Sequence, residues 1–198
     1  MTGNNGTAGS PYDNNGHKNQ KVSGPFTCKG GTYEIRAAIA TIIDRAAFLQ
    51  TIRTIADARN THIICFNADM LAGTRHAHTA ICHAARSYTE GTMVSNTLEM
   101  EALLFAAGSR QCSLAAQFGI HLGENHLYVC CYPECDNLWD ALFPVIHVVE
   151  DAWSGMDSQK QAYLMDLFTI TREELATTNG DRLTDLIIER IALLEVYR

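Results

Sequence analysis

Two predicted helix starts carry basic side chains where helices usually carry acidic ones. Arg75 and His76 fall in the first turn after a Gly-Thr pair, and Arg110 and Gln111 fall in the first turn after a Gly-Ser pair. A cation there opposes the helix macrodipole and costs roughly 0.3–1 kcal/mol, whereas a bound anion would reverse that sign. Free backbone N–H groups, the dipole and an arginine together suit a phosphate. The pattern indicates either two phosphate sites or two arginines that reach solvent or a nearby carboxylate.

Histidines and cysteines form two further clusters that could bind a metal or act in catalysis. On a predicted helix His78 points about 160° away from His76, because each residue turns about 100°. Cys130 and Cys131 are neighbours in a predicted strand, where successive side chains face opposite sides. Neither cluster has the paired spacing of a zinc module, and the chain lacks a nucleophile elbow, a P-loop and a His-Glu-x-x-His motif. We expect no metal, no cofactor and no catalytic activity, with a metal- or thiol-dependent enzyme as an alternative.

The last predicted helix, over residues 182–196, has more apolar surface than one packing face requires. At about 100° per residue, most of its aliphatic side chains form one broad arc, whereas Ile188 falls on the otherwise polar side. The arc consists of Leu183, Leu186, Ile187, Ile191, Leu193 and Leu194. Two interpretations are open: the helix is buried between other elements, or part of its apolar surface lies against another protein.

The elements that must position these side chains are predicted from strand and helix patterns that alternate along the chain. Apolar alternation over 33–39 and the β-branched run 61–67 predict strands, and 126–132 predicts a third. Helices are predicted after Asp44, over 74–87, from a capping box at Asn96 and Glu99 to 108, over 109–119, from 137, and over 158–168 and 182–196. We expect one α/β (α+β) domain over 27–198, with a small mixed sheet of about three to four strands flanked by helices. Residues 1–26 have almost no aliphatic side chains, which predicts a disordered tail.

Composition is typical of a soluble globular protein. Of 198 residues 46% are apolar and 19% are charged, and no apolar run approaches the roughly 18 residues of a membrane span. The formal charge is −7, with +3 over residues 1–90 and −10 over the remainder, so any nucleic-acid binding must be local. Seven cysteines in mostly apolar surroundings, without a secretory leader, predict reduced thiols and a cytoplasmic location.

Four segments of the chain, taken in order, resemble one known family. They span residues 66–76, 95–104, 107–111 and 188–195, and they contain an Asn-Ala pair, a Gly-Ser-Arg-Gln run and an Ile-Ala-Leu-Leu-Glu run. Together they are similar to the kinase-binding small subunit of the KEOPS complex (the Cgi family), from about residue 33 to the end. The resemblance implies one α/β domain without cofactors. It also implies a non-catalytic subunit of the machinery that attaches threonylcarbamoyl to an adenosine of tRNA.

The same resemblance implies two partners. Family members bind the small atypical kinase of the complex, and archaeal members grip the unpaired CCA end of tRNA. The candidate tRNA contacts in this chain are Asn67, Arg75, His76, Arg110 and Gln111, and the candidate kinase contacts are Ile187, Ile188, Ile191, Leu194 and Glu195. Cys112 stands where the family usually has an aliphatic residue, and the acidic balance offers few phosphate contacts. A pure kinase-binding adaptor without tRNA contact is therefore the alternative.

Overall fold

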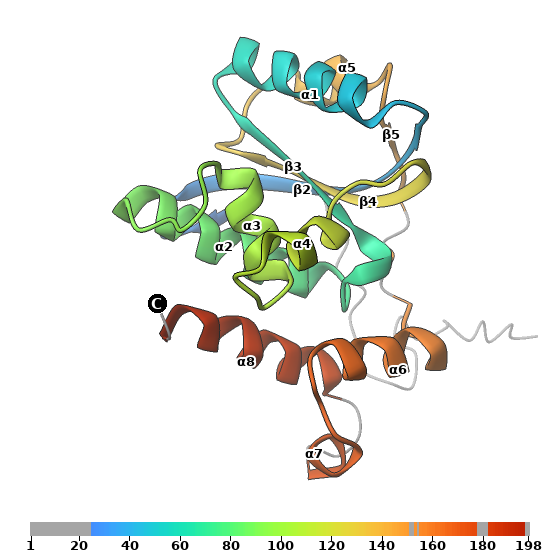
Figure 1. The fold of residues 1–198 in the computed structure, drawn as a ribbon. Coiled ribbons are helices and arrows are strands. Elements are labelled where there is room, and N and C mark those ends of the chain that lie inside the picture. Colours follow the sequence, from blue (N-terminus) through green and yellow to red (C-terminus); the bar gives the residue numbers. More distant parts are fainter. Residues whose placement is uncertain (1–24, 151–152, 154, 178–181, 197–198) are drawn as a thin grey trace, which may run out of the picture.

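The computed structural model of the chain describes residues 25–150, 153, 155–177 and 182–196. Most of the predicted tail lies outside the described residues, although Phe26, the last residue of that prediction, already belongs to the first strand. The described residues form a sheet with helices on both of its faces (Figure 1).

The sheet has five strands in the order β1-β2-β4-β3, and β5 also pairs with β2. The strands are β1 (Phe26–Cys28), β2 (Gly31–Ile42), β3 (His62–Asn67), β4 (Gly123–Tyr132) and β5 (His147–Val148). Every pairing among these strands is antiparallel. The predicted α/β class with a small sheet is confirmed. The sheet is antiparallel rather than mixed, because β4 lies between β2 and β3 and runs against both.

Alternation along the central strands creates two hydrophobic cores, one on each face of the sheet. Tyr128 and Cys130 of β4 contribute to one core, whereas Leu127 and Val129 contribute to the other. This follows from the two-residue period of a strand. Both faces of β4 are therefore buried, as expected for the central strand of a covered sheet.

A single helical layer covers one face. It consists of α1 (Arg45–Arg59) and α5 (Leu138–Leu142), which contact each other. As predicted, Asp44 caps α1, since its carboxylate accepts hydrogen bonds from the backbone N–H groups of Ala46 and Ala47. Phe48 and Ile52 of α1 are buried against the sheet, which leaves the opposite side of the helix in solvent.

Two helical layers cover the other face. α2 (Thr74–Glu90) and α3 (Leu98–Ala106) pack on the sheet, and α8 (Leu183–Val196) packs on α2 and α3. α6 (Ser158–Leu167) and α7 (Arg172–Thr177) precede α8 on the same side of the molecule (Figure 1). Three short elements are η1 (Ala68–Met70), α4 (Cys112–Ala115) and η2 (Ala116–Phe118).

The predicted capping box of α3 is wrong by one position. Thr97 caps this helix by accepting a hydrogen bond from the backbone N–H of Met100. Glu99 instead accepts a hydrogen bond of 2.8 Å from Nδ1 of His62. Glu99, which was expected to cap its own helix, therefore joins α3 to the edge strand β3.

Candidate functional site

The inner side of α8 buries four of the six residues of the apolar arc predicted from its sequence. Ile187 and Ile191 are fully buried, and Leu183 and Leu186 nearly so, where α8 contacts α2 and α3. The prediction that Ile187 and Ile191 are kinase contacts is therefore wrong, because the α2 and α3 layer already covers this side of the helix. The interpretation of a helix packed into the core holds for these four residues, whereas Leu193 of the predicted arc is exposed.

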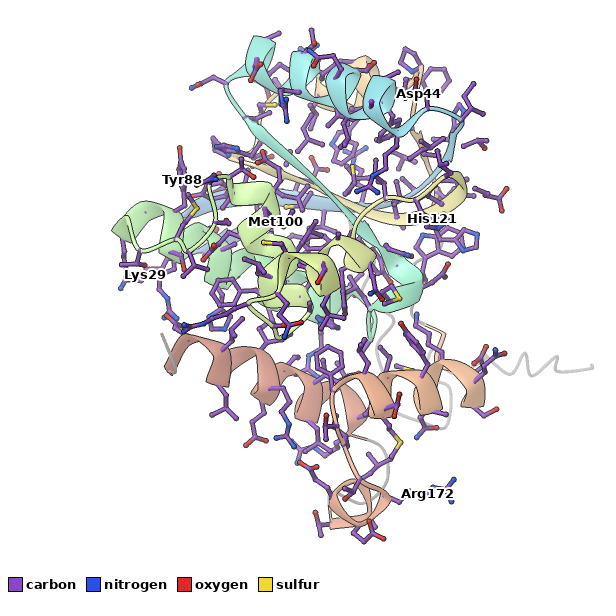
Figure 2. The ribbon with its side chains drawn as sticks, viewed as in Figure 1. Lys29, Asp44, Tyr88, Met100, His121 and Arg172 are labelled. Carbon is purple, nitrogen blue, oxygen red and sulfur yellow. The ribbon has the colours of Figure 1, made fainter. Side chains whose placement is uncertain are left out.

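The outer side of α8 carries apolar side chains that are partly or fully exposed. Glu189 and Ala192 are exposed, Leu193 is 36% exposed and Ile188 is half-buried. Within the described part of the chain, neither Ile188 nor Leu193 belongs to the two hydrophobic cores. Figure 2 shows side chains that project from α8 both toward and away from α2 and α3. The outer side is therefore available to a partner.

The last turn of α8 is held by the chain itself. Glu195 accepts a hydrogen bond of 2.7 Å from Nδ1 of His83 and forms an ion pair with Arg86. Leu194 packs against the core and lines a hollow of about 10 Å³, which has room for about one water molecule. Leu194 and Glu195 are thus engaged internally, and Ile188 is the predicted kinase contact that stays open to a partner.

A cleft of about 230 Å³ lies where α2 begins, beside the first turn of α8. Gly73, with φ of 82°, is the N-cap of α2 and provides no side-chain cap. Arg75 and Arg182 both line the cleft and both bind Asp185, at 2.9 Å from Nη1 of Arg75 and 2.6 Å from Nε of Arg182. Two guanidinium groups and one carboxylate leave a net positive charge beside the positive end of a helix dipole. This arrangement suits a single phosphate.

Asp185 pairs with both arginines of this cleft. The hydrogen bond from Arg182, with a further one from Arg75, lowers the pKa of Asp185, so the carboxylate is ionised at neutral pH. A phosphate entering the cleft must compete with Asp185 for the two arginines. The alternative noted for Arg75, in which the arginine reaches a nearby carboxylate, is the arrangement observed.

The structure overturns two predicted tRNA contacts. His76 is fully buried: its Nδ1 accepts a hydrogen bond from the backbone N–H of Ala72, and its Nε2 donates one of 2.8 Å to the carbonyl oxygen of Ala106. Burial lowers the pKa of His76 to about 4, so the ring is neutral and joins α2 to the end of α3. Asn67 is only 8% exposed, and its side chain caps η1 by accepting from the N–H of Asp69. Both residues hold the fold together instead of facing a ligand.

Arg110 and Gln111 lie near the other end of α8. Gln111 is the N-cap of the four-residue α4, so Arg110 precedes the helix and does not lie in its first turn as predicted. Nη2 of Arg110 is 3.5 Å from the carbonyl oxygen of Leu194. Leu194 lies nine residues beyond Asp185 in α8, a rise of about 14 Å. The two predicted phosphate sites are therefore separate, at opposite ends of one helix.

Sequence reasoning missed Arg182 and Asp185. Both lie at the start of α8, where an acidic first-turn residue is ordinary helix chemistry and gives no reason to single it out. Their importance depends on contact with Arg75, which is more than 100 residues earlier in the chain. No local signal predicts that contact.

The histidine and cysteine clusters do not assemble into a metal site among the residues that the structure describes. All seven cysteines are free thiols. Burial raises the pKa of Cys65 to about 12 and that of Cys131 to about 11, and it raises the pKa of Cys130 well above its usual range. These thiols are protonated at neutral pH, whereas a nucleophile needs the thiolate. Their role is to fill the two cores.

A comparison with protein families supports the resemblance seen in the sequence. The family model described as kinase binding protein CGI-121 matches residues 41–195, from the end of β2 to the last turn of α8. The chain belongs to the CGI-121 family. The predicted family is thereby confirmed, and the CGI-121 family is one of kinase-binding proteins. No curated protein matches the chain.

The CGI-121 match includes nearly all of α8 and the helices α2 and α3 on which α8 packs. The matched residues include Arg75 and Arg182, which line the cleft. The match ends at Glu195, whose contact with His83 fixes α8 to α2. Among the described residues, no helix is both long and apolar enough to cross a bilayer.

Proposed function

We propose that this chain is a non-catalytic, cytoplasmic subunit of the KEOPS complex, which binds the atypical kinase of the complex and helps to recruit tRNA by its CCA end. The observation that supports kinase binding most is the outer side of α8. Ile188 and Ala192 form one row of this side, and Glu189 and Leu193 form the next row, since residues four apart are neighbours on a helix. A protein interface of about 800 Å² per partner draws most of its energy from a few such anchors.

The kinase interface is tested with substitutions on this outer side. Ile188→Arg and Leu193→Arg should each keep the melting temperature of the chain and abolish co-purification of the kinase, because the new charge would have to be desolvated in the contact. Tyr163→Arg is the matched control, since Tyr163 is 43% exposed and belongs to α6 instead of α8. Kinase binding by both α8 variants would place the interface elsewhere, starting with the helices beside Asn96 and Gly108.

The proposed tRNA contact uses the arginines at the two ends of α8. Arg75 and Arg182 line the cleft at the start of the helix, and Arg110 and the exposed Gln111 lie near its end. Single-stranded RNA ends are held by a basic groove and by stacking on aromatic or guanidinium groups. The separation of about 14 Å along the helix is one that a short single strand can follow.

Removal of the CCA end tests this contact. Intact tRNA should bind the kinase-bound chain more tightly than tRNA lacking CCA, and Arg75→Glu and Arg182→Glu should each remove the difference. Arg172→Glu on α7 is the matched control, because Arg172 is exposed and lies outside the cleft. Equal binding of both tRNAs would contradict the proposed tRNA contact and would not affect the proposed kinase binding.

A second candidate function is kinase binding without tRNA contact. Asp185 favours it, because this carboxylate already pairs with both arginines of the cleft. The net charge of −7 acts in the same direction, since it repels a polyanion. Asp185→Asn distinguishes the two functions: it should strengthen tRNA binding if the cleft takes a phosphate.

A further inference from the structure

Exposed apolar side chains gather where α1 begins, on the opposite face of the sheet from α8. Ile43 is 92% exposed, Phe143 68%, Leu122 64% and Leu49 44%. We call these four residues the α1 patch. None of them takes part in the kinase or tRNA contacts proposed above.

Strand pairing brings the members of the α1 patch together. Ile42 pairs with Gly123, so Ile43 and Leu122 follow directly from paired positions at the same end of the sheet. Asp44 and His121, their neighbours in the chain, both lie at this end in Figure 2. The patch therefore begins at the junction of β2, β4 and α1.

Phe143 reaches the same end of the sheet from α5. This helix packs on α1, and the chain after it pairs with β2 through His147 and Ile39. The Phe143 ring contacts the His147 ring edge-on, with 5.6 Å between centroids. Because β5 is antiparallel to β2, the residues that precede His147 lie toward the Ile42 end of β2.

Two arginines border the α1 patch. Arg45, Leu49 and Arg53 are spaced four residues apart, so they form one row along the exposed side of α1. Within the described part of the chain, neither Arg45 nor Arg53 meets a carboxylate. The first turn of α1 holds no acidic residue.

We propose that the α1 patch is a second protein-docking surface, which takes an acidic amphipathic helix of a partner other than the kinase. The apolar side of such a helix would cover Ile43, Leu49 and Phe143, and its flanking carboxylates would pair with Arg45 and Arg53. Residues 1–90, which contain α1 with Arg45 and Arg53, carry a formal charge of +3, which favours an acidic partner over a basic one. The chain would then hold two partners on opposite faces of its sheet (Figure 1).

Three other occupants fit these charges less well. A symmetric second copy would place Arg45 and Arg53 against the same arginines of its partner. The first 24 residues of the chain contain two lysines and one acidic residue, so they offer almost no complement. An anionic membrane is bound by clusters of about four to eight basic residues, whereas α1 presents two here.

The test uses the full chain and a fluorescent synthetic peptide of about five helical turns. Its leucines follow an i, i+3, i+4, i+7 pattern, and its other positions are glutamate. Fluorescence anisotropy should show saturable binding that Arg45→Glu with Arg53→Glu weakens by at least about tenfold. Arg172→Glu is the matched charge control and should have little effect. Arg45→Glu should fold normally, because a carboxylate suits a helix N-terminus.

A second set of variants, which removes apolar side chains, distinguishes docking from simple charge attraction. Ile43→Ser with Phe143→Ser should weaken peptide binding about as much as the arginine variant, without a change in melting temperature, since both side chains are exposed. A peptide with lysine in place of glutamate should not bind.

Four results would overturn the proposal. They are equal peptide binding by all variants, binding to phosphatidylserine vesicles that the arginine variant loses, self-association that the patch variants abolish, and loss of kinase co-purification in the patch variants. The last result would identify the kinase as the occupant of the α1 patch. The Ile188→Arg experiment tests the proposed kinase interface independently, so the two failures are distinguishable.

Discussion

The two faces of the sheet are closed in different ways. A single layer of α1 and α5 separates one core from solvent, whereas α2 is itself covered by α8 on the other face. Arginines follow this difference: Arg75 and Arg86 of α2 pair with Asp185 and Glu195 of α8, while Arg45 of α1 has no such partner among the described residues. An arginine on an outward helix face thus joins layers where a second layer exists and remains a free surface charge where none does.

The largest expected effect comes from the contact between the two helical layers. Ile191→Ala should lower the free energy of unfolding by roughly 2–5 kcal/mol, because the side chain is fully buried and its loss leaves a cavity. Leu49→Ala removes a similar volume from the outer side of α1 and should change stability by less than about 0.5 kcal/mol. Urea denaturation measures both. A small loss for Ile191→Ala would mean that α8 is loosely packed, and the contrast between the faces would disappear.

The next largest effect is expected from acid, which should lower the free energy of unfolding through His76 on the two-layered side of the sheet. The pKa of His76 is about 4 in the folded chain, against about 6.5 in the unfolded chain. Between these values the unfolded chain binds more protons, so stability present above pH 6.5 is lost as the pH falls toward 4, by up to about 3 kcal/mol. Burial also lowers the pKa of His78 to about 4, which acts in the same direction.

Denaturation at a series of pH values measures this loss, and His76→Gln should flatten its slope. Imidazole resonances followed by NMR give a direct check. A titration of His76 near pH 6.5 would contradict the buried, neutral ring.

The ion pairs between layers should contribute less. Glu195→Gln removes the charge that binds His83 and Arg86 and should cost about 1 kcal/mol or less, because these side chains are partly exposed and screened. Added salt should reduce that cost. Glu189→Gln, on the exposed side of α8, is the matched control and should leave stability unchanged. An equal effect of the two variants would show that Glu195 does not fix the end of α8.

The smallest effect is expected on the single-layered side. Arg53→Ala should change the free energy of unfolding by less than about 0.5 kcal/mol, since the side chain is exposed and unpaired within the described residues. Arg86→Ala is the comparison, because its guanidinium joins α2 to α8. A clear loss of stability in Arg53→Ala would reveal a partner for this arginine within the chain.

Several elements follow from local sequence patterns. Asp44 and the spacing of Phe48 and Ile52 predict α1, and the structure confirms both the cap and the buried side. Alternation predicts β2, and the β-branched run over 61–67 predicts β3; a strand is also predicted over 126–132, where β4 lies. β1, β5 and α7 were not predicted, because three, two and six residues are too few to display a period.

The candidate site was predicted only in part. The uncapped start of α2 and the position of Arg75 follow from the sequence, and so does an excess of apolar surface on α8. His76 has the residue type and spacing of an anion ligand, yet the end of α3 buries it through the carbonyl oxygen of Ala106. Ile187 and Ile188 are adjacent in the chain but lie on different sides of α8, and α2 and α3 cover only one side.

The sequence by itself determined the main helices and strands, the family and the charge asymmetry of the chain. Caps and periodicity act between residues three or four positions apart in helices and two apart in strands, so local order is enough to predict them. Only the tertiary structure decided that β4 separates β2 from β3, that Asp185 meets Arg75, that His76 is buried, and that α8 has one covered side. Each of these features is a contact between distant segments, and no local period encodes which distant segment will supply the partner.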